Sequence, residues 1–562
     1  MSEKTKSLPS PRNNDARDEI LSILKKRIMV LDGAMGTMIQ KHSLKEEDFR
    51  RGAPFADCVK ELKGNNDALN VTRPDIIEEI HREYIEAGAD IITTNTFSSN
   101  RISQQEYGLG EFASLLSLEG ARLARKAADL ANVEFLRSGI NRKVYVAGSM
   151  GPSSKSLSLA PDISDPSFRN YDFDTISEYF SEQAKALIEG GVDVILLETG
   201  FDALNTKAAL YAINKTAPGF PVMVSVSAND LSGRTLTGQT LEAFYDSVSH
   251  YPLLSFGINC SLGAKEMIPL VDEISSFCRF PVSCYPNAGL PNEMGEYEDK
   301  PSHMASCVFK MAEHGSVNFV GGCCGTTPDH ICAEATAVSD IPPRSFPPEE
   351  ESRPLRVSGL ESVKVDLKSG NFCNIGERTN VAGSRKFARL IASGEYDQAL
   401  QIAADQIENG ASIIDINMDD AMLESDIQME KFVRYIQNDP SVAKAALMID
   451  SSSWTTILAG LKNAQGKCIV NSISLKEGEE VFLSHAREIH SLGAAMVVMA
   501  FDEEGQATTF ERKISICERA YGLLTGEGIP PEDIIFDVNV LSIGTGMHEH
   551  SRYAIDFIEA VR

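Results

Sequence analysis

The sequence predicts an α/β protein with two (β/α)8 barrels in tandem, the second of them incomplete. Apolar strands follow glycine-terminated amphipathic helices repeatedly, as in EGGVDVILLETG at 189–200 and ENGASIIDINMDD at 408–420. Glycine suits a helix C-cap, and a near-continuous apolar strand suits a parallel sheet covered on both faces. A segment rich in proline and charge at 339–359 divides these repeats into two groups.

The first group contains eight predicted strands, at 28–37, 89–97, 144–151, 192–200, 221–230, 253–261, 281–289 and 317–325. Eight parallel strands alternating with helices over about 320 residues have the size and strand count of a TIM-type barrel. We therefore expect a barrel over residues 18–338. The polar residues 1–17 are expected to form a disordered tail, and residues 339–359 an interdomain linker.

The second group contains six predicted strands, at 372–380, 412–420, 446–452, 468–474, 496–503 and 534–546. Six strands would leave two edges unpaired, whereas a closed barrel has none. We interpret residues 360–562 as a partial barrel, in a fragment of a longer protein. An open doubly wound sheet is the alternative.

Composition narrows the classes of function. The chain has 53 basic and 80 acidic residues, a net charge of −27 that argues against nucleic acid or an anionic membrane surface as a partner. No segment approaches the 18 or so apolar residues of a membrane span, and the polar start does not resemble a secretory signal. These features predict a cytoplasmic protein.

Two adjacent cysteines follow the eighth predicted strand, in the sequence VNFVGGCCGTT. Cys323 and Cys324 are flanked by glycines, which permit the backbone to curl where β geometry ends. Cys260 ends the sixth strand, at the face where barrel enzymes keep their active sites. Three converging thiolates would make a zinc site with its fourth position open. The alternatives are buried packing cysteines, a vicinal disulfide or a redox role.

The predicted metal site indicates a particular chemistry. Zinc held by three thiolates carries net negative charge and is a poor Lewis acid for making hydroxide. It is better suited to holding a further thiol as a nucleophilic thiolate, because coordination deprotonates a thiol. The sequence therefore predicts alkyl transfer to the sulfur of a substrate.

At this point the motifs carry a family resemblance. LDGAMGT, TNTF, LLET, GINC, CYPNAGLPN and GGCCGTTPDHI resemble the zinc-dependent homocysteine methyltransferases. NIGERTNVAGSRKF, DINMDD, NSISLKEGE, VVMAFDEEGQA and IGTGM resemble the folate module of the cobalamin-dependent methionine synthases. The resemblance runs from about residue 18 to residue 562. It implies that homocysteine, bound to zinc, takes a methyl group from methylcobalamin, which 5-methyltetrahydrofolate recharges.

In the first barrel, the resemblance implies that Cys260, Cys323 and Cys324 are catalytic zinc ligands. It further implies that Asp32, Gly33 and Glu198 hold the amino-acid end of homocysteine. A carboxylate can accept hydrogen bonds from an ammonium group, and a backbone amide can donate to a carboxylate. Alternatively, Asp32 and Gly33 form an ordinary turn and Glu198 caps the next helix.

In the second barrel, the resemblance implies that the folate pterin is bound by Glu377, Asp450, Asn471 and Asp537. Aspartate and asparagine suit the amide and amino edge of a pterin, because together they offer both acceptors and donors. Three of the four end predicted strands. Helix N-capping is the alternative role for such residues.

The methyl carrier is expected to lie outside this chain, since the sequence contains no histidine loop of the cobalamin-binding type. We therefore expect homocysteine, folate and a cobalamin-carrying domain as partners. Two alternatives stay open. One is a zinc-dependent homocysteine methyltransferase with another donor, such as betaine; the other is a zinc- or pterin-binding fragment without activity.

Overall fold

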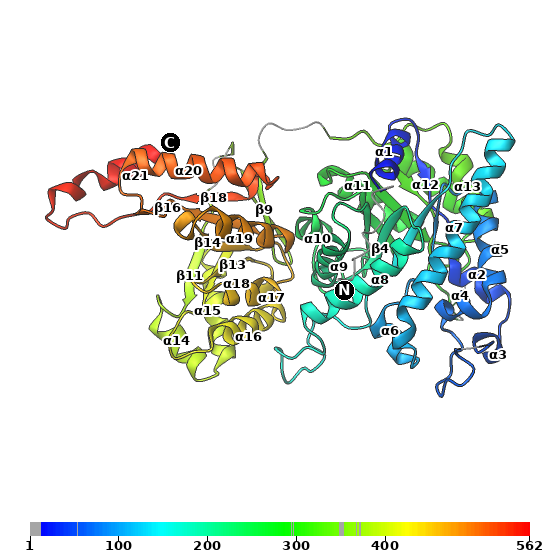
Figure 1. Ribbon diagram of the computed structural model, residues 1–562, viewed down its shortest axis with the longest axis horizontal. Helices are drawn as coiled ribbons and strands as arrows, with labels where there is room; N and C mark the ends of the chain where they lie inside the picture. Colours follow the sequence, from blue (N-terminus) through cyan, green and yellow to red (C-terminus); the bar gives the residue numbers. More distant parts are fainter. Residues whose placement is uncertain are drawn as a thin grey trace, which may run out of the picture.

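The computed structural model describes residues 13–562, except residues 53, 294, 296, 348–352, 367, 370 and 371. Two α/β units lie next to each other along the longest axis of the molecule (Figure 1), one built on an eight-stranded sheet and one on a six-stranded sheet. None of the helices in the described ranges is both long and apolar enough to cross a membrane.

The first unit is a nearly closed parallel barrel, as the sequence predicts. Its strands are β1 (Met29–Val30), β2 (Ile91–Thr93), β3 (Tyr145–Met150), β4 (Val194–Gly200), β5 (Val222–Val226), β6 (Ser255–Gly263), β7 (Val282–Asn287) and β8 (Phe319–Val320). Their order is β1-β8-β7-β6-β5-β4-β3-β2. A parallel bridge between Leu31 and Ile91 joins the two outer strands, so the sheet curves back on itself.

Helices surround this barrel. The main ones are α5 (Pro74–Ala87), α7 (Ala113–Arg137), α8 (Phe173–Glu189), α9 (Ala203–Thr216), α10 (Leu241–Val248), α11 (Ala264–Phe277), α12 (Pro301–Glu313) and α13 (Pro328–Val338). Because side chains alternate along a strand, each strand contributes to two cores. Val146 belongs to the core shared with the helices, whereas its neighbour Ala147 belongs to the core inside the barrel.

Helix α1 (Asn13–Leu24) closes the end of the barrel at which the strands begin. Its buried Ile20 and Leu24 pack in the same interior cluster as Met29 of β1. Arg17 donates hydrogen bonds to the carbonyl oxygens of Pro252 and Leu253, which precede β6. The expected disordered tail at 1–17 is therefore wrong for residues 13–17, which belong to α1. Residues 1–12 lie outside the described part of the chain.

The second unit is an open parallel sheet with the six predicted strands. They are β11 (Ile375–Asn380), β12 (Ile413–Asn417), β13 (Ala446–Asp450), β14 (Ile469–Ile473), β15 (Ala495–Met499) and β18 (Ile534–Asp537), paired in that order. Among the described residues, β11 and β18 each have a neighbour on one side only. A small antiparallel pair that the sequence did not predict, β16 (Phe501–Asp502) and β17 (Gly505–Gln506), follows β15.

Helices of the second unit pack on one face of its sheet, which favours the partial barrel over the doubly wound alternative. They are α14 (Arg385–Ala392), α15 (Tyr396–Glu408), α16 (Ser425–Gln437), α17 (Pro440–Ala443), α18 (Trp454–Leu461), α19 (Glu479–Ser491) and α20 (Phe510–Gly526). The last helix, α21 (Tyr553–Val561), contacts α20 instead. The outward side chains of Ile414 and Val470 join the core shared with these helices. The inward side chains of Ile413 and Ile469 form a separate cluster.

A β-hairpin occupies part of the segment that was expected to be a linker. Strands β9 (Leu355–Ser358) and β10 (Ser362–Val365) pair antiparallel. Val357 is fully buried in the inner cluster of the second sheet, and Arg356 forms ion pairs with Glu242 and Asp246 of α10. The linker expected at 339–359 is therefore wrong for residues 355–358, whose side chains pack against both units. Residues 348–352 lie outside the described part of the chain.

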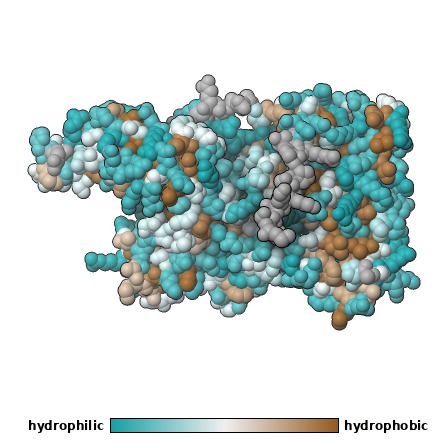
Figure 2. Space-filling model, in the orientation of Figure 1, coloured by the Kyte–Doolittle hydropathy of each residue, from teal (hydrophilic) through white to brown (hydrophobic). Residues whose placement is uncertain are grey.

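The two units also contact each other directly. On the first unit, α9 and the segment before β6 form this contact. Lys207 of α9 is 2% exposed, and its Nζ donates hydrogen bonds to the carbonyl oxygens of Ala464 (3.0 Å) and Gly466 (3.1 Å). The rings of His250 and His490 meet edge to face, with centroids 6.1 Å apart. Polar side chains therefore lie within the buried interface between the two units, which we call the seam. The face of the molecule drawn in Figure 2 is mostly hydrophilic.

Candidate functional site

Three cysteine sulfurs meet at the end of the first barrel where its strands finish. Cys260 lies near the end of β6, and Cys323 and Cys324 follow β8. Their Sγ atoms lie within 4.8 Å of one another, and those of Cys260 and Cys324 are 3.8 Å apart. The backbone of Cys260 has a φ of 59° and that of Ser261 a φ of 61°, a left-handed conformation that non-glycine residues adopt rarely. The chain is therefore bent at this strand end, where the thiol of Cys260 meets those after β8.

The sulfur cluster fits a single soft metal ion. Tetrahedral zinc with bonds of about 2.3 Å to sulfur places two sulfur ligands about 3.8 Å apart. The Cys260–Cys324 distance agrees with that spacing. Hydrogen bonds from the thiols of Cys260 and Cys323 lower the pKa of Cys324 far below its usual range. The contacts of Cys323 with Cys260 and Cys324 raise the pKa of Cys323. A set of three thiols favours zinc over the hard ions magnesium and calcium.

A cavity of about 650 Å³ opens onto the sulfurs. Asp32, Gly33 and Glu198 line it together with the three cysteines, so the structure brings all the residues predicted for the first barrel to one place. No lysine or arginine is among the described residues that line this cavity. Its wall therefore offers sulfur and carboxyl groups to a ligand but no cation.

Three carboxyl groups line the cavity, those of Asp32, Asp67 and Glu198, and burial raises the pKa of each. Asp32 is 3% exposed and accepts hydrogen bonds from the backbone N–H (2.8 Å) and the hydroxyl (3.0 Å) of Thr93. Burial raises the pKa of Asp32 to about 8, and burial raises the pKa of Glu198, which accepts from the Ser149 hydroxyl, to about 7. A carboxyl group that is buried without a cation favours a positively charged ligand. The pair of Asp32 and Glu198 suits an ammonium group.

The structure bears on the alternative roles of these residues. Glu198 does not cap α9, because Asp202 does so by accepting from the N–H groups of Leu204 and Asn205. Asp32 accepts from the neighbouring strand rather than from a local turn. A Cβ added to Gly33 would lie 2.7 Å from Oγ1 of Thr326, so a side chain does not fit there.

In the second unit, polar residues form a row across four neighbouring strands. Asn380 pairs in register with Asn417, Asn417 with Asp450, and Asp450 with Asn471. The side-chain amide of Asn417 donates to Oδ2 of Asp450 at 3.0 Å. Because the row lies at the carboxyl ends of parallel strands, it occupies the position where open α/β sheets bind ligands.

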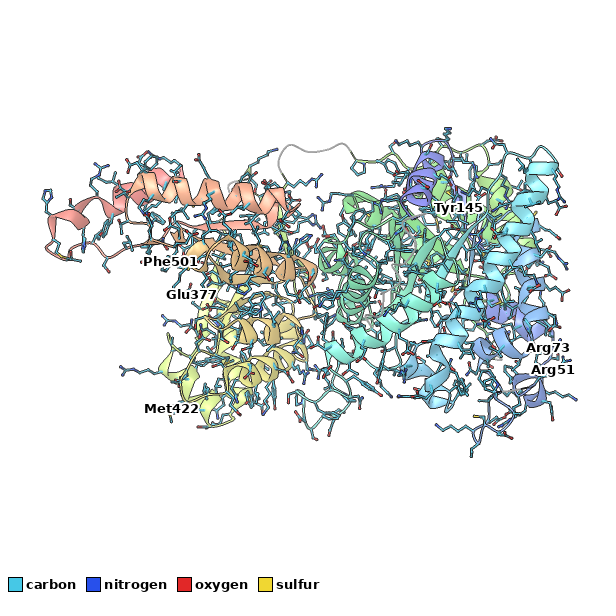
Figure 3. The ribbon with its side chains drawn as sticks, viewed as in Figure 1. Arg51, Arg73, Tyr145, Glu377, Met422 and Phe501 are labelled. Carbon is cyan, nitrogen blue, oxygen red and sulfur yellow. The ribbon has the colours of Figure 1, made fainter. Side chains whose placement is uncertain are left out.

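The remaining residues predicted for the pterin are placed differently. Asp537 ends β18, where its Oδ1 accepts from the backbone N–H of Asn539 (2.8 Å). Glu377 is exposed on the edge strand β11 and lies on the side of the second unit that faces away from the first (Figure 3). Asp450 and Asn471 share the central row, whereas Asp537 and Glu377 lie on the two outer strands of the sheet.

Capping does not explain the central row. Ser453 occupies the N-cap position of α18, and Ser474 caps the short helix at Leu475–Glu477 with its side chain. Asp450 and Asn471 therefore have no capping role at the helices that follow their strands.

Sequence reasoning missed several residues at both sites. Asp415 precedes Asn417 by two positions on the same face of β12; it is 2% exposed, and its Oδ1 has no hydrogen-bond partner among the described atoms. Burial raises the pKa of Asp415 to about 7. The alternation in SIIDINMDD could have indicated it. In the first barrel, Thr93 and Ser149 contact the predicted carboxyl groups from other strands, and no local pattern marks them.

Comparison with known proteins agrees with the division of the chain into two units. The family model described as Homocysteine S-methyltransferase matches residues 29–338, more than half of the chain, and the one described as Pterin binding enzyme matches residues 376–562. The chain therefore belongs to the homocysteine S-methyltransferase family. It is a methyltransferase that carries a pterin-binding domain after its homocysteine S-methyltransferase domain.

Solved structures of the homocysteine methyltransferase MmuM from Escherichia coli are similar to a little over half of the chain. The oxidized form is 21% identical, with a TM-score of 0.45 over 57% of this chain and 99% of that chain. The metallated form is 22% identical, with a TM-score of 0.43 over 56% of this chain and 98% of that chain.

Proposed function

We propose that the first barrel transfers a methyl group to the sulfur of homocysteine, giving methionine, and that 5-methyltetrahydrofolate at the second unit is the methyl source. One observation carries the first half of this proposal. Three thiols within 4.8 Å of one another share a cavity of about 650 Å³ with Asp32 and Glu198. A thiol group and an ammonium group on one small substrate match these two sets of residues.

Each residue then has a defined task. Cys260, Cys323 and Cys324 would hold zinc, which when bound keeps a substrate thiol deprotonated near neutral pH. Asp32 and Glu198 would accept hydrogen bonds from the substrate ammonium group, and the absence of a side chain at Gly33 would let its backbone N–H approach the substrate carboxylate. The proton of the substrate thiol leaves to solvent or to a carboxylate of the cavity before the methyl group is attacked.

For the second unit, the polar row supports pterin binding. Asp450 and Asn471 lie side by side in register and offer acceptors and donors together, as the amide and amino edge of a pterin requires. We assign Asp537 and Glu377 to the outer parts of the same site. Asp415, buried beneath the row with a free acceptor atom, would form its floor.

A methyl group must then travel between two sites on separate sheets. We propose cobalamin as the carrier, held by a domain or protein other than the two units described. The exposed position of Glu377, on the side away from the first unit, supports a mobile carrier over direct transfer (Figure 3).

The decisive experiment measures zinc content and methionine formation from homocysteine and added methylcobalamin. The wild-type chain is compared with Cys324→Ser, and with Cys332→Ser as a control, because Cys332 is an exposed cysteine of α13. We expect about one zinc per chain and turnover in the wild type and the control, and loss of both in Cys324→Ser. Zinc-free wild type, or full activity of Cys324→Ser, would contradict the proposal.

A further inference from the structure

The side-chain amide of Asn259 is fully buried and lies between the sulfur cluster and the carboxyl side of the first site. It lies on β6, directly before Cys260, and is 0% exposed. Its Oδ1 accepts hydrogen bonds from the backbone N–H of Thr199 (3.0 Å) and the hydroxyl of Ser225 (2.7 Å). Its Nδ2 donates to Oγ1 of Thr199 (2.9 Å) and to Sγ of Cys323 (3.8 Å). The four hydrogen-bonding positions of the amide are all used.

Two of these bonds fix a strained piece of backbone. Thr199 has a φ of 58°, the left-handed conformation that a β-branched residue adopts only when its surroundings impose it. Asn259 binds both the N–H and the hydroxyl of Thr199. Because Glu198 immediately precedes Thr199, this strain fixes the direction in which the Glu198 carboxyl enters the cavity.

Another bond reaches the sulfur cluster. An N–H group that donates to a metal-ligating sulfur holds the ligand in orientation, and such outer contacts typically change metal affinity by about 10- to 100-fold. The Nδ2 group of Asn259 faces Cys323 in this way. One side chain therefore contacts both the sulfur side of the cavity and the backbone that carries its carboxyl side.

We infer that Asn259 is a positioning residue that couples recognition of the substrate ammonium group to metal binding, by holding Thr199 and Cys323 at once. This inference rests on the proposed function, since it assumes zinc at the sulfurs and an amino acid in the cavity. Asparagine is the residue type that suits the contacts with both Thr199 and Cys323. Aspartate has the acceptors without the N–H donors, and serine is too short to reach both strands.

The test uses three variants. Asn259→Ala removes all four bonds, and the isosteric Asn259→Asp keeps the acceptors for Thr199 and Ser225 but loses both N–H donors. Ser225→Ala is the matched control, because it removes the one bond that touches neither Thr199 nor Cys323. Zinc affinity is measured by chelator competition without substrate. Binding of norleucine, an amino acid without sulfur, is measured by calorimetry and reports on the carboxyl side alone.

We expect Asn259→Ala to weaken zinc and norleucine binding, each by about 10-fold or more. Asn259→Asp should weaken zinc at least as strongly but norleucine less, whereas Ser225→Ala should change both by less than about 3-fold. A larger loss of zinc affinity than of norleucine affinity in Asn259→Asp distinguishes positioning from a general loss of packing. A general loss of packing would lower both affinities together in every variant.

The outcomes separate the inference from the proposed function. If the wild type binds neither zinc nor norleucine, the proposed function fails. If the wild type binds both and Asn259→Asp retains wild-type zinc affinity, the proposed function stands and the inference is overturned. Equal losses of zinc and norleucine affinity in Asn259→Asp and Ser225→Ala would overturn it as well, since the Ser225 hydroxyl bonds to neither Thr199 nor Cys323.

Discussion

The two units place polar groups at the same ends of their strands but in different surroundings. In the nearly closed first barrel, Asp32 and Glu198 line a cavity of about 650 Å³, and burial raises their pKa values to about 8 and about 7. In the open second sheet, Glu377 is exposed on an edge strand and Asp450 is held by a neighbouring amide. In the nearly closed barrel the perturbed carboxyl groups therefore line the cavity at the strand ends, whereas in the open sheet the most perturbed one, Asp415, lies two positions before the end of its strand.

The opposite ends of the two sheets are covered by different elements. Helix α1 supplies Ile20 and Leu24 to the interior of the first barrel, whereas the β9–β10 hairpin supplies Val357 to the inner cluster of the second sheet. Both solutions bury the apolar layer beneath the polar strand ends. Four experiments test how far the two units differ and how far they depend on each other.

The largest effect is expected from Lys467→Met. Lys467 and Asp533 are 5% and 2% exposed, and Nζ lies 2.6 Å from Oδ1 near the starts of β14 and β18. Removing the lysine leaves a buried carboxylate without its cation, which costs about 3–5 kcal/mol. Urea unfolding followed by circular dichroism should show this loss in the second unit, with zinc binding by the first unit unchanged.

Arg487→Gln is the control for that variant, because solvent screens its exposed ion pair with Glu527, which therefore contributes little to stability. Equal losses in the two variants would show that the buried pair has no special importance. Loss of zinc from Lys467→Met would show that metal binding by the first unit depends on the stability of the second.

The next effect concerns the polar row. Asp450→Ala should weaken binding of 5-methyltetrahydrofolate by about 10- to 100-fold, because hydrogen bonds to a charged group contribute about 1.5–3 kcal/mol. Calorimetric titration measures the affinity, and zinc content should stay at the wild-type value. Asp405→Asn, an exposed carboxyl on α15, serves as the control. Unchanged affinity in Asp450→Ala would remove Asp450 from the site.

A smaller effect is expected at the seam between the units. Lys207→Met leaves the carbonyl oxygens of Ala464 and Gly466 without their donor, at a cost of about 1–3 kcal/mol. Scanning calorimetry should then show the two units unfolding at more widely separated temperatures than in the wild type. Lys185→Met, at an exposed lysine of the neighbouring helix α8, should leave the separation as it is. An unchanged profile for Lys207→Met would mean that the units are coupled elsewhere.

The smallest effect is a dependence on pH at the same seam. Burial lowers the pKa of His250, with further contributions from His490, Lys207 and Lys467, and burial lowers the pKa of His490, opposed by Asp533. Below about pH 6.5 the unfolded chain therefore binds protons at these two histidines that the folded chain does not, so the two histidines lower the stability as the pH decreases. The raised pKa values of Asp32, Glu198 and Asp415 act in the opposite direction. We expect each histidine to contribute a loss on the order of 1 kcal/mol between pH 7 and 5.5.

Urea midpoints at the two pH values measure this loss. In His490→Phe the contribution of the seam histidines should be about half as large, since His250 remains, whereas the buried His81 of the first unit contributes equally to both proteins. An identical change of midpoint with pH in the wild type and the variant would assign the pH dependence to other groups.

Much of the fold could be predicted because strand periodicity is local. All fourteen predicted strands occur, six of them in the second sheet, since each contains an apolar run, which in several cases follows a helix that ends at a glycine. The elements that were missed depend on distant partners. Helix α1 is held by the barrel interior, and the β9–β10 hairpin by two different units, although LRVSGLESVKV contains the turn glycine of a hairpin.

The same distinction applies to the candidate sites. Cys260, Cys323 and Cys324 could be predicted because strand ends of a parallel barrel converge. Their supporting residues could not be predicted, because contacts such as Ser149 with Glu198 or Asn259 with Thr199 depend on the register between strands that lie 49 and 60 residues apart in sequence.

The β9–β10 hairpin limits how the chain can be divided. A cut after residue 359, where composition suggests a boundary, would leave β9 on one piece and β10 on the other. The first piece would expose Val357 to water, and the second would lose the cover of its inner apolar layer. Separate production of the pterin-binding unit should therefore start before Leu355, so that the hairpin stays with the sheet that it covers.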